Sequence, residues 1–345
     1  MVISLLLGCF CPACLVPEPK LASGKAAEKP LIEGIYTADP SAHVFEDKLY
    51  IYPSHDQDGR APIGDDGSQF NMVDYHVFSL TDIDGPVTDH GVALHVDDVP
   101  WAERHMWAPD AAYKNGTYYL YFPARDKAGI FRIGAATAAS PEGPFKAEPK
   151  PIEGSFSIDP CVFVDDDSAA YMIFGGLWGG QLEKWTTGDF IESGKPPGML
   201  SPALGPRIAK MGEDMLSFSE PVREIRILDD DGEPVKAERS SRRFFEGAWM
   251  HKYRRKYYLS YSTGDAHTIV YAVGDSPYGP FTYQGTVLTP VIGWTTHHSI
   301  VQYRGEWYLF YHDASLSKGV DHQRSVKAAK LTFSSDGTIE PIDPR

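Results

Sequence analysis

The sequence has few cysteines, no long apolar run and no surplus of positive charge. Only Cys161 lies beyond the first fourteen of the 345 residues, so the body of the chain has no disulfide framework. No apolar stretch reaches the length of about 20 residues that a membrane-spanning helix needs. Asp and Glu number 47 against 32 Lys and Arg, and the formal net charge of −15 repels phosphate backbones. These features disfavour membrane spanning and nucleic-acid binding and leave a neutral or cationic ligand as the expectation.

The first thirty residues differ in composition from the rest. Residues 2–16 are apolar and resemble the core of an export signal, although no basic segment precedes them, and a polar linker follows to about Pro30. Residues 6–9 resemble a bacterial lipoprotein cleavage site, which would make Cys9 the lipidated residue. We therefore expect residues 1–30 to be the leader and linker of an exported bacterial protein, periplasmic or lipid-anchored at Cys9. The alternative is a disordered leader or a mis-assigned start on a cytoplasmic protein.

Aromatic and turn-forming residues are abundant, whereas no long amphipathic helix is apparent. Aromatic residues make up 12% of the chain, and Gly and Pro number 32 and 27. This composition is typical of β-structure with short hairpins. One layout recurs five times: a short apolar stretch with a polar residue, a strand-like run, a turn and a Tyr-rich strand. The five copies begin at residues 36–40, 106–110, 157–160, 245–249 and 296–299.

Each copy predicts a β-hairpin, because turn residues separate its two strands. The turns lie at residues 46–47, 115–116, 165–167, 254–255 and 304–305. Two copies are followed by a third strand and by the matching segments 140–145 and 276–281. Five small antiparallel sheets of this kind predict an all-β fold, a five-bladed β-propeller over residues 31–345.

The polar residue at the start of each inner strand would face the common axis of such a propeller. These positions hold acids and histidines: Asp39, Asp110, Asp159, Glu246, and His297 or His298. A single acid of this kind is usually a turn residue that closes a hairpin. Five equivalent positions occupied by acids or histidine favour a functional centre instead. Carboxylates that face each other across a pocket suit hydrolysis of a glycosidic bond, in which one donates a proton and another activates water.

Five motifs, taken together in this order, resemble those of glycoside hydrolase family 43: residues 38–40, 107–110, 158–160, 245–247 and 297–299. The resemblance extends from about Leu31 to the C-terminus and implies a five-bladed propeller with the activity of an inverting glycosidase. Asp39 matches the general base, and Glu246 matches the general acid. Asp159 matches the carboxylate that raises the pKa of the acid and orients it.

An inverting mechanism sets the spacing of the two catalytic carboxyl groups. We expect those of Asp39 and Glu246 to lie roughly 6.5–9.5 Å apart, which leaves room for a water molecule. The competing interpretations are Asp-Pro turns at Asp39 and Asp159, and an exposed hairpin acid at Glu246.

The resemblance also implies residues that contact the sugar. Trp107 matches an aromatic residue at the floor of the sugar pocket, where an apolar sugar face stacks on such a ring. Trp178 and Trp249 are weaker candidates for the same contact. Arg324 resembles an arginine that the family places at the sugar, where it hydrogen-bonds hydroxyls or biases the base. The alternatives are a core position for Trp107 and a surface strand position for Arg324.

A metal ion on the axis is a further implication of the resemblance. His297 resembles the central histidine of the family, which in many members binds an axial ion, commonly calcium, mostly through water. His298 is its neighbour, and a strand turns the two side chains to opposite sides, so we favour His297. A hard cation prefers oxygen ligands, so water must supply the rest and sodium remains an alternative. The other alternative is a neutral histidine that binds no metal.

The motif details look most like the β-xylosidase and α-L-arabinofuranosidase branch. We expect exo-cleavage of β-1,4-xylooligosaccharides derived from xylan, with arabinofuranosides second and an endo-arabinanase acting on arabinan as an alternative. The propeller accounts for the sequence up to Arg345. We therefore expect propeller loops, or a neighbouring subunit of an oligomer, to shape the pocket. Residues 193–243 are the best candidate for such a loop. A non-catalytic carbohydrate-binding propeller and a protein-binding scaffold are the alternatives of another class. The cluster of acids disfavours both of them.

Overall fold

Five mainly antiparallel sheets follow one another along the chain, one for each predicted repeat. The computed structural model describes residues 24–25, 29–57, 63–266, 268–294 and 296–345. The first sheet contains β2 (Tyr36–Phe45), β3 (Lys48–Asp56), β4 (Asp74–Leu80) and β5 (Thr88–His95). The second contains β6 (Ala102–Arg104), β7 (Asp110–Lys114), β8 (Thr117–Asp126), β9 (Phe131–Ala138) and β10 (Lys146–Ala147).

The other three sheets use the remaining strands. The third contains β11 (Cys161–Val164), β12 (Ala170–Phe174), β13 (Arg207–Lys210) and β14 (Arg223–Glu224). The fourth contains β16 (Glu246–Tyr253), β17 (Lys256–Ser262), β18 (Ile269–Gly274) and β19 (Phe281–Leu288), extended by β15 (Ile227–Leu228), β23 (Ile342–Asp343) and β1 (Gly24–Lys25). The fifth contains β20 (His298–Tyr303), β21 (Glu306–Asp313) and β22 (Ser325–Leu331).

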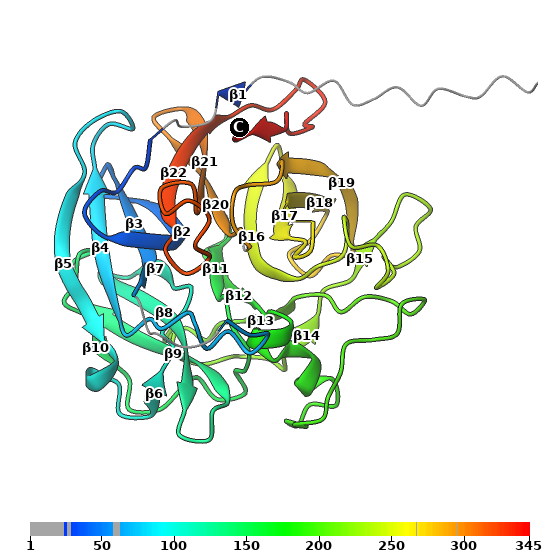
Figure 1. Cartoon of the computed structure of the whole chain (residues 1–345), viewed down its shortest axis with the longest axis horizontal. Helices are drawn as coiled ribbons and strands as arrows, with labels where there is room; N and C mark the ends of the chain where they lie inside the picture. Colours follow the sequence, from blue (N-terminus) through cyan, green and yellow to red (C-terminus); the bar gives the residue numbers. More distant parts are fainter. Residues whose placement is uncertain (1–23, 26–28, 58–62, 267, 295) are drawn as a thin grey trace, which may run out of the picture.

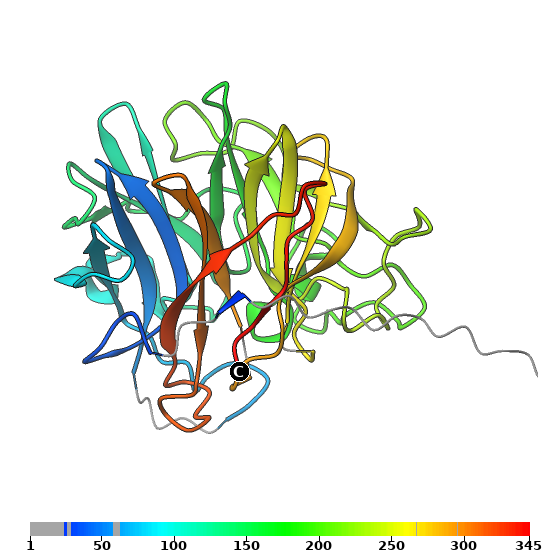
Figure 2. The same cartoon turned by 90° about the horizontal axis from the view of Figure 1, so that it is seen from above.

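The inner strands of the five sheets form a closed ring. β2, β7, β11, β16 and β20 contact one another in turn, and β20 contacts β2. Figure 1 shows these five strands around a common centre, with the later strands of each sheet toward the periphery. Figure 2 shows the sheets from above, standing around the same centre. The predicted all-β, five-bladed propeller is confirmed.

The predicted hairpin turns join the first two strands of the sheets. Both turn residues have a positive φ at 46–47, 115–116, 254–255 and 304–305. This backbone matches the twist of the flanking strands in a two-residue hairpin. Only the turns at 115–116 and 304–305 use glycine, so residues such as Arg254 and Arg255 adopt the left-handed conformation without it.

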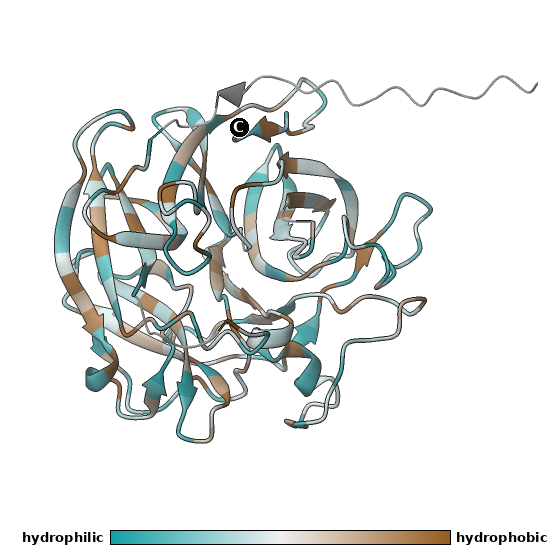
Figure 3. Ribbon diagram, viewed as in Figure 1, coloured by the Kyte–Doolittle hydropathy of each residue, from teal (hydrophilic) through white to brown (hydrophobic). Residues whose placement is uncertain are grey.

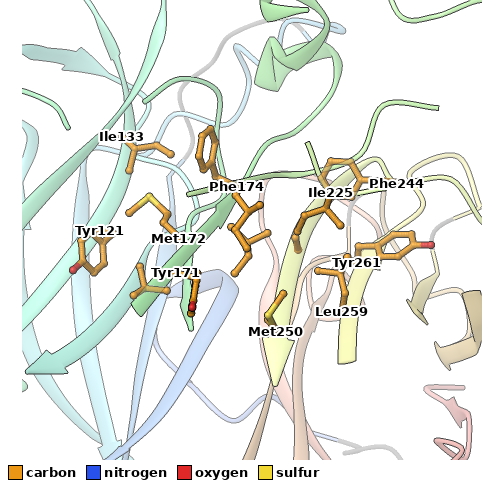
Figure 4. Close-up of a cluster of buried hydrophobic side chains, with 14 of the residues drawn as sticks. Tyr121, Ile133, Tyr171, Met172, Phe174, Ile225, Phe244, Met250, Leu259 and Tyr261 are labelled. Atoms are coloured by element: carbon orange, nitrogen blue, oxygen red, sulfur yellow. The ribbon is translucent and has the colours of Figure 1, made fainter. Parts of the chain in front are cut away.

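The hydrophobic core lies between neighbouring blades. One cluster joins the second, third and fourth sheets through side chains such as Tyr121, Met172 and Leu259, and Figure 4 shows this packing. Smaller clusters join the first sheet to the second, the fourth to the fifth, and the fifth back to the first. Because every blade depends on both neighbours, removing one such buried side chain would cost about 2–5 kcal/mol.

Helical structure is sparse in the described part of the chain. It consists of the 3₁₀ helices η1 (Val96–Asp98), η2 (Trp178–Gly180) and η3 (Leu182–Trp185). None of the described helices has the length and apolar character needed to cross a bilayer. Figure 3 likewise shows hydrophobic and hydrophilic residues interspersed along the strands.

The predicted leader falls mostly outside the described residues. Residues 1–23 and 26–28 are among those not described, so export and lipidation at Cys9 stay predictions. Gly24 and Lys25, which we assigned to the linker, pair in parallel with Ile342 and Asp343 of β23.

Candidate active site

A cavity of about 360 Å³ lies where the inner strands begin. Asp39 belongs to β2 and Glu246 begins β16, while Asp159 lies two residues before β11 and His297 lies one residue before β20. Because the ring of sheets brings these strand starts together, residues more than 250 positions apart share one cavity. It is lined by Asp39, Ile63, Gly64, Asp65, Gly67, Gln69, Phe70, Met72, Trp107, Ala108, Ile158, Asp159, Leu177, Trp178, Gly179, Gly180, Phe245, Glu246, Trp294, His297, Asp321 and Arg324.

Backbone irregularities aim the acids into the cavity. In the β2–β3 ladder, Ala38 pairs with Ser54 and Ser41 pairs with Tyr52, so two residues, Asp39 and Pro40, oppose one. This is a β-bulge, which bends a strand and re-aims a side chain. Asp39 has a φ of 50°. A left-handed backbone at an aspartate is uncommon and costs free energy, which marks the position as functional.

The same device recurs at the other two acids. Asp159 has a φ of 57°, and a second register shift follows Glu246 in the β16–β17 ladder. Gly247, inside that shift, has a φ of 63°, and a Cβ there would lie 2.7 Å from the Cδ2 atom of His297. Only glycine suits this position, because both its conformation and the histidine exclude a side chain.

Asp39 is a buried carboxylate held in its ionised form. Its Oδ2 accepts a hydrogen bond from Oγ of Ser54 at 2.6 Å, and its backbone N–H donates to Nδ1 of His312 at 2.9 Å. Nη1 and Nη2 of Arg324 donate to Oδ1 and Oδ2 of Asp39 at 3.1 and 3.3 Å. Burial raises the pKa of Asp39, but the positive charge of Arg324, with His312, His297 and Ser54, outweighs it and lowers the pKa to about 2.

Arg324 is fixed by a second carboxylate. Its Nε and backbone N–H donate to Oδ2 of Asp56 at 2.9 and 2.8 Å, and Nη2 donates to Oδ1 at 2.8 Å. Its guanidinium also lies 4.9 Å from the centre of the Phe70 ring. Burial opposes the charge of Arg324, but Asp39 and Asp56 raise its pKa. One buried cation therefore serves two carboxylates, and the planar fork of arginine suits this role.

The pKa values of Glu246 and Asp159 are shifted in the opposite direction from that of Asp39. Burial, followed by the negative charge of Asp39, raises the pKa of Glu246 to about 8. Burial, followed by the charges of Glu246 and Asp39, raises the pKa of Asp159 well above its usual range. The N–H of Gly247 donates to Oδ2 of Asp159 at 3.0 Å and holds that carboxyl in place. The site therefore keeps one carboxylate ionised and stores a proton on the neighbouring pair at neutral pH.

The two neighbouring histidines point in different directions. His297 lines the cavity, with Nε2 3.8 Å from Oδ2 of Asp159. Burial lowers the pKa of His297, and neither of its ring nitrogens has a hydrogen-bond partner among the described residues. His298 is fully buried and pairs through Nε2 with Oγ of Ser260 at 2.6 Å. His298 is therefore removed from the predicted metal site, because the strand turns it away from the axis.

Aromatic side chains form the walls of the cavity. Trp107 donates its indole N–H to the carbonyl of Phe70 at 2.9 Å. A Cβ on Gly67 would lie 2.4 Å from Cη2 of Trp107, so the loop over this ring requires glycine. Trp178 has a φ of 54° and stacks on Trp294 with ring centres 5.9 Å apart. Both stacked rings line the cavity and present flat apolar faces to a ligand.

Comparison with known proteins decides the family. A sequence profile of Glycosyl hydrolases family 43 matches residues 27–339. The chain belongs to glycoside hydrolase family 43. Xylosidase/arabinosidase 43A of Humicola insolens is 62% identical to this family 43 chain over 324 residues, which are 91% of this chain and 99% of that protein. Beta-xylosidase of Xylanibacter ruminicola is 48% identical, over 89% of this chain and 97% of that protein.

Solved structures of the family share the fold. A β-xylosidase/α-arabinofuranosidase from a compost microbial metagenome, crystallised with xylotriose in a calcium-free form, has a TM-score of 0.91 and 60% identity, over 93% of this chain and 99% of that one. An enzyme of Xanthomonas citri in complex with xylotriose has a TM-score of 0.88 and 54% identity, over 93% and 94%. This family 43 protein is therefore an enzyme that hydrolyses O-glycosyl bonds.

Two expectations about the pocket of this family 43 enzyme are corrected. Trp249 lies in the core between the fourth and fifth sheets and donates its indole N–H to the carbonyl of Ile300 at 2.9 Å, so it does not line the cavity. Residues 193–243 do not line it either, because their strands β13, β14 and β15 complete the third and fourth sheets. Residues 63–72 and Trp294 shape the cavity instead.

Several residues of the site were not singled out from the sequence. Asp56, Ser54 and His312 hold Asp39 and Arg324, and Asp321 also lines the cavity. One signal was present for two of them. Ser54 and Asp56 alternate along the Tyr-rich strand of the first repeat, which places both side chains on one face of it.

Proposed function

We propose that this chain is an inverting exo-glycosidase that releases xylose from β-1,4-xylooligosaccharides and also removes arabinofuranose side chains. The observation that carries the proposal is the opposite pKa shift of Asp39 and Glu246, two carboxyl groups that line one cavity. Oppositely shifted carboxyl groups assign a base and an acid at the same pH. The names of the relatives, xylosidase/arabinosidase and beta-xylosidase, support the choice of sugars.

In the proposed mechanism Asp39 is the general base. Its pKa of about 2 keeps it ionised at neutral pH, so it can accept a proton from a water molecule that attacks the anomeric carbon. Arg324 holds the carboxylate by two hydrogen bonds, and Ser54 fixes its orientation. The separation of roughly 6.5–9.5 Å between the carboxyl groups of Asp39 and Glu246 stays a prediction.

Glu246 is the proposed general acid. With a pKa of about 8 it is protonated at neutral pH and can donate its proton to the departing glycosidic oxygen. Asp159, positioned by the N–H of Gly247, is the proposed carboxylate that raises the pKa of Glu246 and orients it. Single displacement through this arrangement inverts the configuration at the anomeric carbon.

Trp107, Trp178 and Arg324 are the proposed sugar-contacting residues. The rings of Trp107 and Trp178 offer apolar faces, and the charged guanidinium of Arg324 lines the same cavity. A pentose that stacks on indole and exposes its hydroxyls to charged groups matches this lining. Arabinofuranose and xylopyranose both lack an exocyclic hydroxymethyl group in comparable positions, so one pocket can accept both.

The residues around His297 fit an axial cation, for which calcium is our proposal. Its ring nitrogens have no hydrogen-bond partner among the described residues, and burial keeps the ring neutral with a lone pair to donate. Oδ2 of Asp159, a carboxyl oxygen, lies 3.8 Å from Nε2 of His297. His297 would hold the ion, and water molecules would supply the remaining oxygen ligands. When bound, the ion would add positive charge beside the three carboxyl groups.

A rate comparison tests this function. We expect faster hydrolysis of an aryl β-D-xylopyranoside than of an aryl α-L-arabinofuranoside, and xylose as the first product from xylotriose. NMR during the first turnovers should show α-xylose, the inverted anomer. A chelator should lower the rate and calcium should restore it. Preference for the arabinofuranoside would make the enzyme mainly an arabinofuranosidase, and β-xylose as first product would overturn the inverting mechanism.

A further inference from the structure

A second cluster of ligating side chains lies outside the cavity, on the first blade. One nitrogen from each ring of His55 and His76 and one carboxylate oxygen of Asp74 lie within 4.8 Å of one another. Nδ1 of His55 is 2.5 Å from Oδ1 of Asp74, and the two imidazole rings are 5.1 Å apart at their centres. Each of the three side chains is no more than 16% exposed. None of them lines the cavity of the active site.

The backbone explains why these three side chains meet. The β3–β4 ladder pairs residues only as far as Ile51 with Phe78, and Pro53, which has no N–H, follows. In the β4–β5 ladder, register shifts lie on both sides of His76. Such bulges are conserved devices for re-aiming a side chain. The strands are thus separated at the end where His55 faces Asp74 and His76.

We propose that His55, Asp74 and His76 form a binding site for a divalent transition metal ion such as Zn²⁺. Two imidazoles and one carboxylate are the donors that zinc prefers, whereas calcium prefers oxygen ligands alone. Zinc binds such atoms at about 2.0–2.2 Å, which places the ligand atoms of a tetrahedral site about 3.3 Å apart. Atoms that already lie within 4.8 Å reach this spacing by small side-chain rotations.

Asp89 on β5 completes the arrangement from outside. Its carboxylate oxygens lie 3.0 and 3.2 Å from Nδ1 of His76. A carboxylate that receives the proton of one ring nitrogen leaves the lone pair of the other nitrogen free for a metal and fixes the ring. Metal-binding histidines usually have such a partner, so Asp89 is a second, independent indication of a metal site at His76.

The site would brace the strand that supports the active site. On either side of His55, Ser54 donates to Asp39 and Asp56 accepts from Arg324. Alternation along β3 turns Ser54 and Asp56 toward Asp39 and Arg324 and turns His55 to the opposite face. An ion that binds the folded protein but not the unfolded chain raises the thermal stability of the protein. Zinc at this cluster should therefore tie the end of β3 to β4 without entering the cavity.

Metal titration of the untagged full chain tests the site. After treatment with EDTA, the protein is titrated with Zn²⁺ by calorimetry and with Co²⁺ by visible absorption, and Tm is measured with and without metal. The wild type should bind one equivalent of Zn²⁺ at this site, give tetrahedral Co²⁺ bands and gain in Tm. His55→Gln and His76→Gln should each weaken binding at least ~100-fold, and Asp89→Asn about 10–100-fold.

Two controls make the result specific. His90→Gln changes an exposed histidine on β5 of the same blade that pairs with Ser79, and it should bind zinc as the wild type does. His297→Gln removes the proposed axial ligand and should leave the Co²⁺ bands in place. Wild-type zinc affinity in both His55→Gln and His76→Gln, with metal-free Tm values unchanged, would overturn the proposal. So would a wild type that takes up no zinc at micromolar concentration.

Discussion

Arg324 donates hydrogen bonds from both of its Nη atoms to the two carboxylate oxygens of Asp39. The same guanidinium is held by Asp56, so the proposed base belongs to a buried hydrogen-bonded network of two carboxylates and one arginine. Such a network resists protonation of Asp39 because the positive charge is fixed and shielded from water. The acid tolerance of catalysis should therefore depend on Arg324.

Arg324→Lys should shift the acid limb of the pH profile upward. A lysine carries the charge but cannot donate to Asp39 and Asp56 in a fork, so the pKa of Asp39 should rise from about 2. We expect kcat/KM of the variant to fall between pH 6 and pH 3, where the wild type changes little. Arg304→Lys, in the β20–β21 turn, is the matched control. Identical acid limbs in both variants would contradict the role of Arg324.

The two proposed catalytic residues should differ in their dependence on the leaving group. Asp39→Asn removes the base and should lower kcat about 10²–10⁴-fold on xylotriose and on aryl xylosides alike. Glu246→Gln removes the acid, so its kcat on xylotriose should fall by a similar factor. Its kcat should fall much less on an aryl xyloside whose leaving group needs no proton. The measurement is kcat on both substrates. Near-normal turnover by Asp39→Asn would exclude it as the base.

The alkaline limb should report the carboxyl pair. Because the pKa of Glu246 is about 8, kcat/KM of the wild type should stay level through neutral pH and fall above pH 8. Asp159 shares the proton of the pair, so Asp159→Asn removes the second negative charge that develops when the pair loses that proton, and the alkaline limb should move to lower pH. The readout is the pH profile on an aryl xyloside. A limb that stays in place would show that Asp159 does not raise the pKa of Glu246.

Glu246→Gln should stabilise the fold increasingly as pH rises. The folded pKa of about 8 lies above the ordinary glutamate value of 4.5, so the stability contribution of Glu246 is full below pH 4.5 and is lost as pH rises to 8. A neutral glutamine does not titrate, so the variant keeps this free energy of unfolding, which amounts to about 4 kcal/mol at pH 8. The Tm difference between variant and wild type should be small at pH 4.5 and several degrees at pH 8. An equal difference at both pH values would refute the assignment.

Two tryptophans should separate binding from stability. Trp178→Ala removes a cavity wall that stacks on Trp294, so it should raise KM for xylotriose about 10-fold or more with a smaller change in Tm. Trp249→Phe removes the indole donor to Ile300 in the core between blades, so it should lower Tm and leave KM unchanged. The measurements are KM and Tm for both variants. A raised KM in Trp249→Phe alone would reverse the two roles.

The fold followed from local features of the chain. Five repeats of the same layout, with turn residues at fixed places, predict hairpins because strand alternation and turn conformation are local properties. The positions of Asp39, Asp159 and Glu246 at the starts of inner strands then predict that they meet, since a propeller brings equivalent positions to one axis. The structure places all three in one cavity.

Side-chain partners across the ring depended on tertiary structure. Arg324 reaches Asp39 and Asp56 across 285 and 268 positions of sequence, and no local pattern encodes which carboxylates it joins. Trp249 and Trp178 are equally aromatic, yet only the register of β16 puts the first between two blades. The cavity wall formed by residues 63–72 also depended on tertiary structure, because it rests on the close approach of Gly67 to Trp107. The sequence by itself determined the blades and the acids at their axis, because strands and turns follow from local periodicity. The closed ring decided which charged groups pair and which aromatic rings face the sugar, because those contacts exist only once distant strands meet.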